Sequence, residues 1–352
     1  MRIVLVTDAW HPQINGVVHT WTYMQKMLTA WGHELIVVSP AGSRTIPTPT
    51  EPDVRLCVEP RRHLLRTLAG REPDTLHIAT EGPLGLAARR LARQRGWRYT
   101  TSFHTMFPDY LQARLGIPAS WTWRFMRWFH RPSQRVLVPT PTVRDTLAAR
   151  GLRNLHIWSR GVDTERFRPD AGEPLPYPRP VFLSIGRLAR EKNLDAFLSL
   201  DLPGTKVVVG GGPDEARLRR KFPDAVFLGM KPHDELARYY AGADVFVFPS
   251  LTDTFGLVML EAIACGTPVA AYRSEAPLAV VSDGRTGILH DDLRVACLKA
   301  LELSRVDIRE SALEHGWAAI AYRLLDLQVP ADPRRQKADL DWYPRDVPQP
   351  GI

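Results

Sequence analysis

The stretch FPSLTDTFGLVMLEAIACGTPV, residues 248–269, decides the fold of this chain. It completes an apolar run that begins at residue 245, crosses a polar turn, continues with helical spacing and ends at a second apolar run. Continuous apolar strands that alternate with helices are typical of a parallel sheet covered on both faces. The stretch therefore predicts one strand, loop, helix and strand of a doubly wound α/β domain.

The same alternation extends over most of the chain. Short apolar runs bounded by turn residues occur at 3–6, 35–38, 76–78, 136–138, 181–185, 206–209 and 245–248. The segment HIWSRGVD (156–163) and a proline-rich stretch at 173–180 interrupt the series. Since 352 residues suffice for two cores, we expect two Rossmann-like domains, residues 1–163 and 164–327, facing each other across a ligand-binding cleft. Residues 328–352, rich in prolines and charges, are expected to form a loosely ordered tail.

Charge and composition limit the classes of protein to which the chain can belong. The net charge of +8 favours an anionic partner, which is a phosphorylated ligand, an anionic membrane or a nucleic acid. No apolar run approaches the roughly 20 residues that span a bilayer, and the N-terminus lacks the pattern of a signal peptide. The three cysteines lie far apart and form no CxxC pair. We expect a cytoplasmic protein whose membrane contact is peripheral.

The polar turn in the deciding stretch carries the first candidate binding residues. The unpaired N–H groups of a helix start attract phosphate, and Gly256 permits close approach. Asp253 and Glu261 lie eight positions apart, so both reach a ligand lying across the helix start. Taken alone, an N-cap role for Asp253 and a surface position for Glu261 explain the pattern equally well. The backbone of the predicted phosphate cradle belongs to Thr254, Phe255, Gly256 and Leu257.

Two cations follow the apolar run at 181–185. Arg187 and Lys192 lie just past its end, in the segment SIGRLAREKN (184–193). A lone arginine or lysine is usually an exposed surface residue with no binding role. Combined with the anion-binding helix start, however, the two favour a site for a leaving diphosphate.

The first half contributes two further candidates. The segment TDAWHPQING (7–16) follows the first apolar run and ends in Gly16, which can bring backbone N–H groups toward phosphate. In YTTSFHTMFPDY (99–110), His104 follows another β-prone run and would face the same cleft. A lone histidine is more often structural, so the residues alone leave both roles open for His104.

Other patterns argue against a metal or a bound cofactor. The glycine-rich VVVGGGP (207–213) lacks the spacing of a nicotinamide site, so it more plausibly lets the backbone approach the donor. The only Asp-x-Asp pattern, at 339–341, lies in the proline-rich tail. We expect no metal site and no cofactor besides the donor substrate.

Together these segments resemble the retaining GT-B glycosyltransferases of family 4, over about residues 1–327. The shared features are an early glycine loop, a histidine in Ser-Phe-His-Thr, the cations after Gly186, and an acidic pair with seven residues between. The phrases TDAWHPQINGVV (7–18), SFHTMFPDY (102–110) and TDTFG (252–256) are most similar to the branch that glycosylates membrane lipids. That branch includes sulfoquinovosyl- and digalactosyl-diacylglycerol synthases and GDP-mannose-dependent lipid mannosyltransferases.

The resemblance implies a role for each candidate around the nucleotide. Arg187 and Lys192 would hold the diphosphate, with Gly16 and the backbone at 254–257 completing the cradle. Glu261 would bond the ribose, and the chain at Met230 would lie along the base.

At the reacting centre, the resemblance places His104 beside the transferred sugar. Asp253 stands where the family usually has a glutamate. The shorter side chain would serve the same sugar hydroxyls after a slight repositioning, which leaves the donor hexose undecided.

The implied reaction moves a hexose from a UDP-sugar or GDP-sugar to a hydroxyl of diacylglycerol or another membrane lipid, with fixed dipoles and cations stabilising the diphosphate. Two segments suit the headgroup boundary of the inner membrane face: RRHLLRTL (61–68) and WTWRFMRWFHR (121–131) mix cations with apolar side chains. Tryptophans packed into a core helix explain the second segment equally well.

Other functions remain open at this stage. A GDP-mannose-dependent α-mannosyltransferase acting on a phospholipid or glycan is the nearest alternative. A sugar-nucleotide epimerase uses a similar two-domain architecture. The two carboxylates could suggest a double-displacement glycosidase, against which the phosphate-binding pattern argues. A nucleic-acid-binding protein is disfavoured because no nucleic-acid motif is present.

Overall fold

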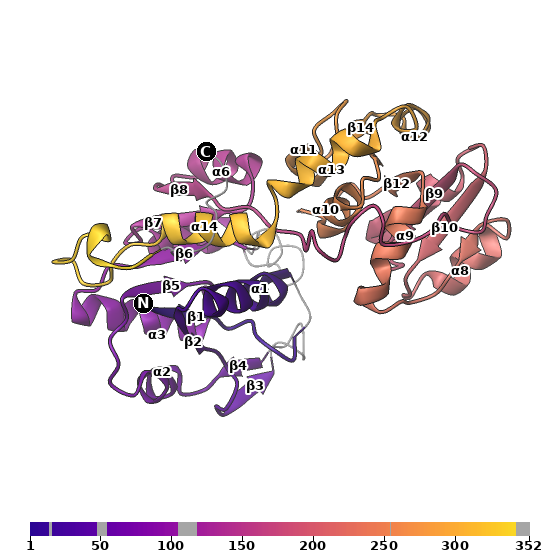
Figure 1. Cartoon of the computed structure of the whole chain (residues 1–352). Helices are drawn as coiled ribbons and strands as arrows, with labels where there is room; N and C mark the ends of the chain where they lie inside the picture. Colours follow the sequence, from indigo (N-terminus) through magenta and orange to yellow (C-terminus); the bar gives the residue numbers. More distant parts are fainter. Residues whose placement is uncertain (14–15, 48–54, 105–117, 254, 343–352) are drawn as a thin grey trace. The chain divides into compact units, whose positions relative to one another are not determined.

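The computed structural model describes residues 1–13, 16–47, 55–104, 118–253 and 255–342. The chain forms two compact units (Figure 1). Unit 1 comprises Met1–Ser159 and Ala318–Ile352, and unit 2 comprises Arg160–Trp317. Each contains a six-stranded sheet with only parallel pairs between its strands. The predicted α/β class with two Rossmann-like sheets is confirmed.

Unit 1 has its strands in the order β2-β1-β5-β6-β7-β8. These strands are β1 (Arg2–Val6), β2 (Glu34–Val38), β5 (Thr75–Ile78), β6 (Thr100–Ser102), β7 (Arg135–Val138) and β8 (Leu155–Ile157). A separate antiparallel pair is formed by β3 (Thr45–Pro47) and β4 (Arg55–Cys57). The helices are α1 (Gly16–Ala30), α2 (Pro60–Leu68), α3 (Pro83–Arg95), α5 (Ala119–His130), α6 (Pro141–Ala149) and α14 (Trp317–Leu327).

Helices cover both faces of this sheet. Ile78 of β5 lies in one core cluster with Leu64 of α2 and Leu84 of α3. Its neighbour His77 faces the other side, where the ring centroid lies 4.8 Å from that of Trp21 on α1. Successive side chains of a strand point to opposite faces. The continuous apolar runs in the sequence thus reflect burial on both sides.

Unit 2 has its strands in the order β11-β10-β9-β12-β13-β14. They are β9 (Val181–Ile185), β10 (Thr205–Val209), β11 (Val226–Phe227), β12 (Val245–Phe248), β13 (Val269–Ala271) and β14 (Gly287–Leu289). The helices are α7 (Leu194–Leu198), α8 (Glu215–Lys221), α9 (Leu236–Gly242), α10 (Leu257–Ala264), α11 (Glu275–Val280), α12 (Leu293–Ala300) and α13 (Arg305–Leu313). Short 3-10 turns of this unit lie at Arg190–Lys192 and His233–Glu235, and a third, at Lys337–Asp339, belongs to unit 1.

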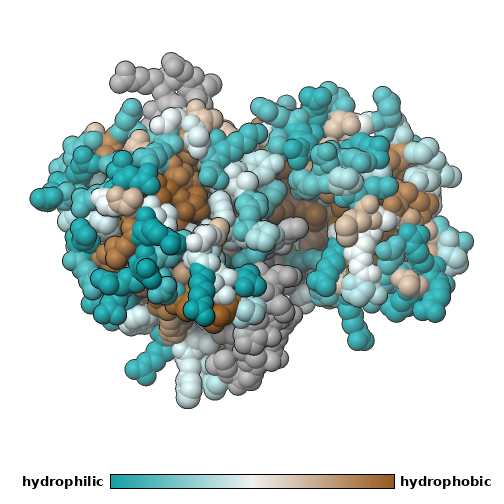
Figure 2. All heavy atoms as spheres, turned by 90° about the horizontal axis from the view of Figure 1, so that it is seen from below, coloured by the Kyte–Doolittle hydropathy of each residue, from teal (hydrophilic) through white to brown (hydrophobic). Residues whose placement is uncertain are grey.

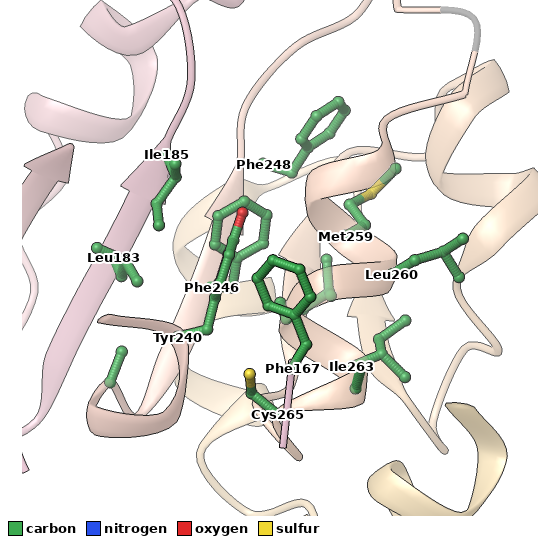
Figure 3. Packing of buried hydrophobic residues seen from close by; sticks show 14 of the residues in the cluster. Phe167, Leu183, Ile185, Tyr240, Phe246, Phe248, Met259, Leu260, Ile263 and Cys265 are labelled. Carbon is green, nitrogen blue, oxygen red and sulfur yellow. The ribbon is translucent and has the colours of Figure 1, made fainter. Parts of the chain in front are cut away.

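The two faces of the second sheet also carry separate cores. Leu183 of β9 packs in one cluster with Tyr240 of α9 and Met259 of α10 (Figure 3). The adjacent Phe182 belongs to the opposite cluster with Phe197 of α7. Helices α9 and α10 therefore lie on one face, and α7 lies on the other.

The domain boundaries differ from the predicted ones. The first unit ends at Ser159 rather than at residue 163, and the chain returns to it at Ala318, so that α14 packs with unit 1. The indole Nε1 of Trp158 donates to the carbonyl of Ile320 at 3.1 Å. The ring of Tyr322 lies 4.5 Å from that of Trp31, which directly follows α1. These contacts are distant in sequence, which is why spacing alone assigned the helix to the second domain.

The prediction of a loosely ordered tail is wrong for residues 328–342. Gln328, Ala331 and Trp342 are buried, and the amide of Ala331 donates to the carbonyl of Asp74 at 2.8 Å. The side-chain oxygen of Gln328 accepts a hydrogen bond from Thr100 Oγ1 at 2.9 Å. Isolated anchors of this kind leave no periodic pattern. Residues 343–352 lie outside the described residues.

Gln328 belongs to a buried polar network in unit 1. Thr100 Oγ1 lies 2.8 Å from Nδ1 of His77, whose Nε2 lies 2.7 Å from Ser102 Oγ. Burial lowers the pKa of His77 to about 3, so this ring is neutral at ordinary pH. Within a neutral network, a lost hydrogen-bond partner leaves a buried polar atom unsatisfied.

We predict that Gln328→Ala lowers the free energy of unfolding by about 1–3 kcal/mol, because Thr100 loses its buried acceptor. Denaturant titration measures the change. Gln134→Ala, which removes an exposed glutamine of the same unit, should stay within about 0.5 kcal/mol of wild type. Equal stabilities for the two variants would show that the tail contributes nothing to unit 1.

Candidate functional site

The strand order of unit 2 has a switch point between β9 and β12, at whose carboxyl ends doubly wound sheets usually open a crevice. These strands are neighbours, yet β9 continues to α7 on one face and β12 continues to α10 on the other. Doubly wound sheets bind ligands at such a switch point. Arg187 and Lys192 follow β9, and Asp253 follows β12. The fold therefore brings together residues that are about 60 positions apart.

Three side-chain contacts join the two loops at this point. Lys192 Nζ lies 2.6 Å from Asp253 Oδ1. Asn193 Nδ2 donates to the carbonyl of Pro249 at 3.1 Å, and Ser250 Oγ donates to the carbonyl of Glu191 at 3.2 Å. The ion pair is partly buried, with 30% and 23% of the two side chains exposed. These contacts fix the loop after β9 to the loop after β12.

Asp253 is not the N-cap of the following helix. Helix α10 begins at Leu257, and its N-cap is Gly256. One oxygen of Asp253 contacts Lys192, while Oδ2 is buried and has no hydrogen-bond partner among the described residues. That oxygen is a buried acceptor on the carboxylate that pairs with Lys192, and its hydrogen bond is unsatisfied among the described residues. Arg187 is exposed, and within the described ranges no carboxylate lies at ion-pair distance from it.

The start of α10 suits an anion. The N-cap Gly256 has no side chain that could cap the N-terminal N–H groups, which carry partial positive charge. Gly256 has φ of +75°, and a Cβ here would lie 2.7 Å from Met259 Cε. Only glycine fits this turn without strain. The side chain of Phe255 is buried in the core, so its backbone alone is available to a ligand. Thr254 lies outside the described residues.

The glycine run after β10 supports the same crevice. A Cβ on Gly210 would lie 1.9 Å from the carbonyl oxygen of Gly186, and one on Gly212 would lie 2.4 Å from that of Leu188. The amide of Leu188 donates to the carbonyl of Gly211 at 3.0 Å. These glycines let two protein loops touch, which is a structural role that the sequence interpretation did not include.

Glu261 is buried on α10 rather than lying at the surface. Its Oε1 lies 2.9 Å from His233 Nε2, and its Oε2 accepts a hydrogen bond from Tyr240 at 2.9 Å. The neighbouring carboxylate raises the pKa of His233. Burial raises the pKa of Tyr240, so its hydroxyl stays a donor. Neither partner was found by sequence analysis, because no local spacing links them to Glu261.

Met230 lies at the carboxyl end of the neighbouring strand β11. It is 78% exposed and follows Gly229, whose carbonyl accepts the amide of Gly210 at 2.9 Å. Its side chain approaches Gly211, where an added Cβ would lie 3.4 Å from Met230 Cε. An exposed apolar side chain therefore lies beside the glycine loop at this end of the sheet.

The two candidates of unit 1 lie at strand ends of its own sheet. Gly16 begins α1 after β1, and His104 follows β6. Carboxyl ends of parallel strands meet at one edge of a sheet. His104 is half-buried, with its ring centroid 6.4 Å from that of Trp158. The end of β6 and the start of α1 thus place both residues toward the carboxyl edge of this sheet, and the shared cleft expected for them stays a prediction.

Asp8 anchors the loop that leads to Gly16, and sequence analysis missed it. Its carboxylate accepts hydrogen bonds from the amide of Leu84 at 3.0 Å and from Thr80 Oγ1 at 2.8 Å. Burial raises the pKa of Asp8, and these hydrogen bonds oppose the shift. The loop after β1 is thereby attached to the start of α3. The described parts of the chain hold no group of three or more potential metal ligands.

Two family models match adjacent parts of the chain. Residues 14–166 match the model described as Glycosyltransferase Family 4, and residues 166–300 match the model described as Glycosyl transferases group 1. The first match falls on unit 1 and the second on unit 2, apart from a few residues at the junction.

Known proteins show the same similarity over nearly the whole chain. A GDP-mannose-dependent alpha-mannosyltransferase of Mycobacterium tuberculosis is 33% identical, over 82% of this chain and 83% of the relative. An alpha-monoglucosyldiacylglycerol synthase of Streptococcus pneumoniae is 27% identical, over 89% and 81%. The solved sucrose-phosphate synthase of Thermosynechococcus elongatus matches with a TM-score of 0.73 at 20% identity, covering 93% and 98%. At that identity the structural match supports the fold alone.

We predict that Arg187→Ala and Lys192→Ala each weaken binding of a nucleoside diphosphate about tenfold to a hundredfold, as expected when one charge-assisted hydrogen bond is lost. Isothermal titration with UDP and GDP measures the affinities. Arg190→Ala, which removes an exposed arginine of the same loop, is the matched control and should bind normally. Wild-type affinity in both folded variants would show that the diphosphate binds elsewhere.

Proposed function

Because the chain belongs to the GT-B glycosyltransferases of family 4, we propose that it transfers a hexose from a UDP-sugar or GDP-sugar to diacylglycerol or another membrane lipid. The coarser activity, hexosyl transfer from a nucleotide sugar, follows from the family itself. The observation that carries the donor part of the proposal is the pairing of Lys192 with Asp253 close to the start of α10 in unit 2.

The proposed donor position assigns one part of the nucleotide sugar to each group. The diphosphate would lie between Arg187, Lys192 and the N–H groups of α10, whose charges stabilise the leaving group. Oδ2 of Asp253, which has no hydrogen-bond partner among the described residues, would accept a hydrogen bond from a hydroxyl of the hexose. Glu261 would bind the ribose. The chain at Met230 would then lie along the base.

The proposed reaction retains the anomeric configuration. The bond from the anomeric carbon to the diphosphate oxygen breaks, and the acceptor hydroxyl oxygen bonds to the carbon on the same face. The acceptor proton passes to the departing diphosphate oxygen. Charge develops on the diphosphate during this step, so fixed dipoles and cations supply most of the stabilisation. Gly16 would complete the phosphate cradle, and His104 would contact the transferred sugar.

Exposed apolar residues on α5 support a lipid acceptor. Trp121 is 72% exposed, Trp128 is 49% exposed, and Phe125 lies between them on the same side of the helix. Trp123 and Phe129 are buried instead. The core interpretation therefore holds for the inward face of the helix, and the outward face leaves apolar side chains exposed, as the membrane proposal requires. The outward face also carries exposed Arg124, Arg127 and Arg131, a combination suited to an anionic headgroup region.

A second cationic surface lies on α2. Arg61, Arg62 and Arg66 are exposed together with Leu65, while Leu64 points into the core. Figure 2 views the side that carries α2 and the β3–β4 pair, and apolar atoms there lie among hydrophilic ones. None of the helices within the described ranges has the length and apolarity needed to cross a bilayer. We propose peripheral attachment at the inner face of the membrane.

A GDP-mannose-dependent α-mannosyltransferase acting on a phospholipid or glycan is the second candidate. The mycobacterial relative favours it, since that protein is named for GDP-mannose and is 33% identical to this chain. The pneumococcal relative, named for diacylglycerol, favours the first candidate. Membership of a transferase family leaves no support for the epimerase alternative. Incubation with labelled UDP-glucose, UDP-galactose and GDP-mannose decides between the donors.

We predict that the purified protein sediments with anionic liposomes, is released as salt rises, and glycosylates diacylglycerol in those liposomes better than any soluble sugar. Combined Trp121→Ala and Trp128→Ala should reduce both sedimentation and lipid transfer. Combined Val306→Ala and Leu313→Ala, which removes comparably exposed apolar residues from unit 2, is the control and should change neither. Efficient transfer to a soluble sugar without liposome binding would rule out the lipid acceptor.

We also predict that transfer needs no divalent cation, because arginine, lysine and helix N–H groups would neutralise the diphosphate. Initial rates measured with and without excess EDTA should agree. Activity that EDTA abolishes and manganese restores would contradict this arrangement of the donor site.

A further inference from the structure

The carboxylate of Glu261 is held by two donors from different elements. Tyr240 comes from α9 and His233 from the turn that follows β11. A carboxylate has about four acceptor positions, so one hydrogen bond to each oxygen leaves the others available. The two donors thus determine where the remaining acceptor positions of Glu261 point.

Tyr240 is the rigid member of this pair. Its ring is fully buried, 5.9 Å from Phe167 and 5.3 Å from Phe246, centroid to centroid. Figure 3 shows Tyr240 and Phe167 side by side in the cluster next to α10. A side chain packed in this way has little freedom to move. Oε2 of Glu261 is therefore fixed by the core itself.

His233 is the accessible member, with 42% of its side chain exposed. Its ring packs edge-on against Phe167 at 5.4 Å. Its Nδ1 lies 3.3 Å from Nη1 of Arg166, and the amide of Arg166 donates to Asp163 Oδ1 at 3.1 Å. A continuous path of contacts therefore runs from the first residues of unit 2 through His233 to Glu261.

We propose that His233 is a positioning residue that orients Glu261 toward the vicinal hydroxyls of the donor ribose, and that Arg166 fixes His233 for this task. The inference rests on the proposed function, since it takes Glu261 to be the ribose ligand. The geometry supports it: one oxygen is set by the buried Tyr240, and the other is set by the half-exposed His233 on the side open to solvent. Loss of His233 would leave the carboxylate free to rotate about its bond to Tyr240.

The test compares UDP and GDP with their 2′,3′-dideoxy analogues by isothermal titration. In the wild type, loss of both ribose hydroxyls should weaken binding about tenfold or more, as expected for hydrogen bonds to a charged group. The ratio of the Kd of the dideoxy analogue to the Kd of the parent nucleotide should fall to about twofold in His233→Ala. His233→Gln should restore it, because the glutamine amide reaches the place of Nε2. The shorter His233→Asn should not restore it.

Controls separate positioning from a general loss of structure. His290→Ala removes a histidine of unit 2 that contacts Asp292 instead, and it should keep the wild-type ratio. In turnover assays, His233→Ala should raise the KM for the donor and leave kcat nearly unchanged, as expected when ground-state and transition-state binding are lost equally.

Two results would overturn the inference. A wild-type ratio in folded His233→Ala or His233→Asn would show that Glu261 keeps its orientation without the histidine. A wild-type protein that does not distinguish the dideoxy analogues would show that Glu261 does not bind ribose. Because no acceptor is present in the titration, failure of the lipid proposal would leave these results unaffected.

Discussion

The ion pair between Lys192 and Asp253 is the contact on which the site of unit 2 depends. The strands before these residues are neighbours, but the chains after them diverge to opposite faces of the sheet. A switch point opens a crevice but does not by itself fix the two loops. The ion pair, with the hydrogen bonds of Asn193 and Ser250, does so. A cation, a free carboxylate oxygen and a helix start are thereby held together.

Helix α10 is fixed along its length, which explains how so short a helix can present a candidate ligand site. Its start turns on Gly256, and its middle is attached through Glu261. At the other end, Arg309 of α13 donates to the carbonyl of Ala264 at 2.7 Å, and Arg305 donates to that of Cys265 at 3.4 Å. Cations at a helix C-terminus satisfy its unpaired carbonyls and favour its dipole. The N–H groups at the start thus keep a fixed direction.

Local patterns in the sequence predicted the alternation of strands and helices and the positions of residues directly after strands. Arg187, Asp253 and His104 could be found because parallel strands bring their carboxyl ends to one edge. Tyr240, His233 and Asp8 could not, since each acts through a partner that is 21 to 76 positions away. The return of α14 and of Gln328 to unit 1 escaped prediction for the same reason. These contacts arise from packing, and the spacing of residue types along a single sequence does not indicate them.

We propose that the donor diphosphate binds where the loops after β9 and β12 are joined. A crystal structure of the chain with UDP or GDP would locate the diphosphate. We expect its oxygens within hydrogen-bond distance of Arg187, Lys192 and the first N–H groups of α10. A diphosphate bound elsewhere, with neither cation in contact and the Lys192–Asp253 pair untouched, would contradict it.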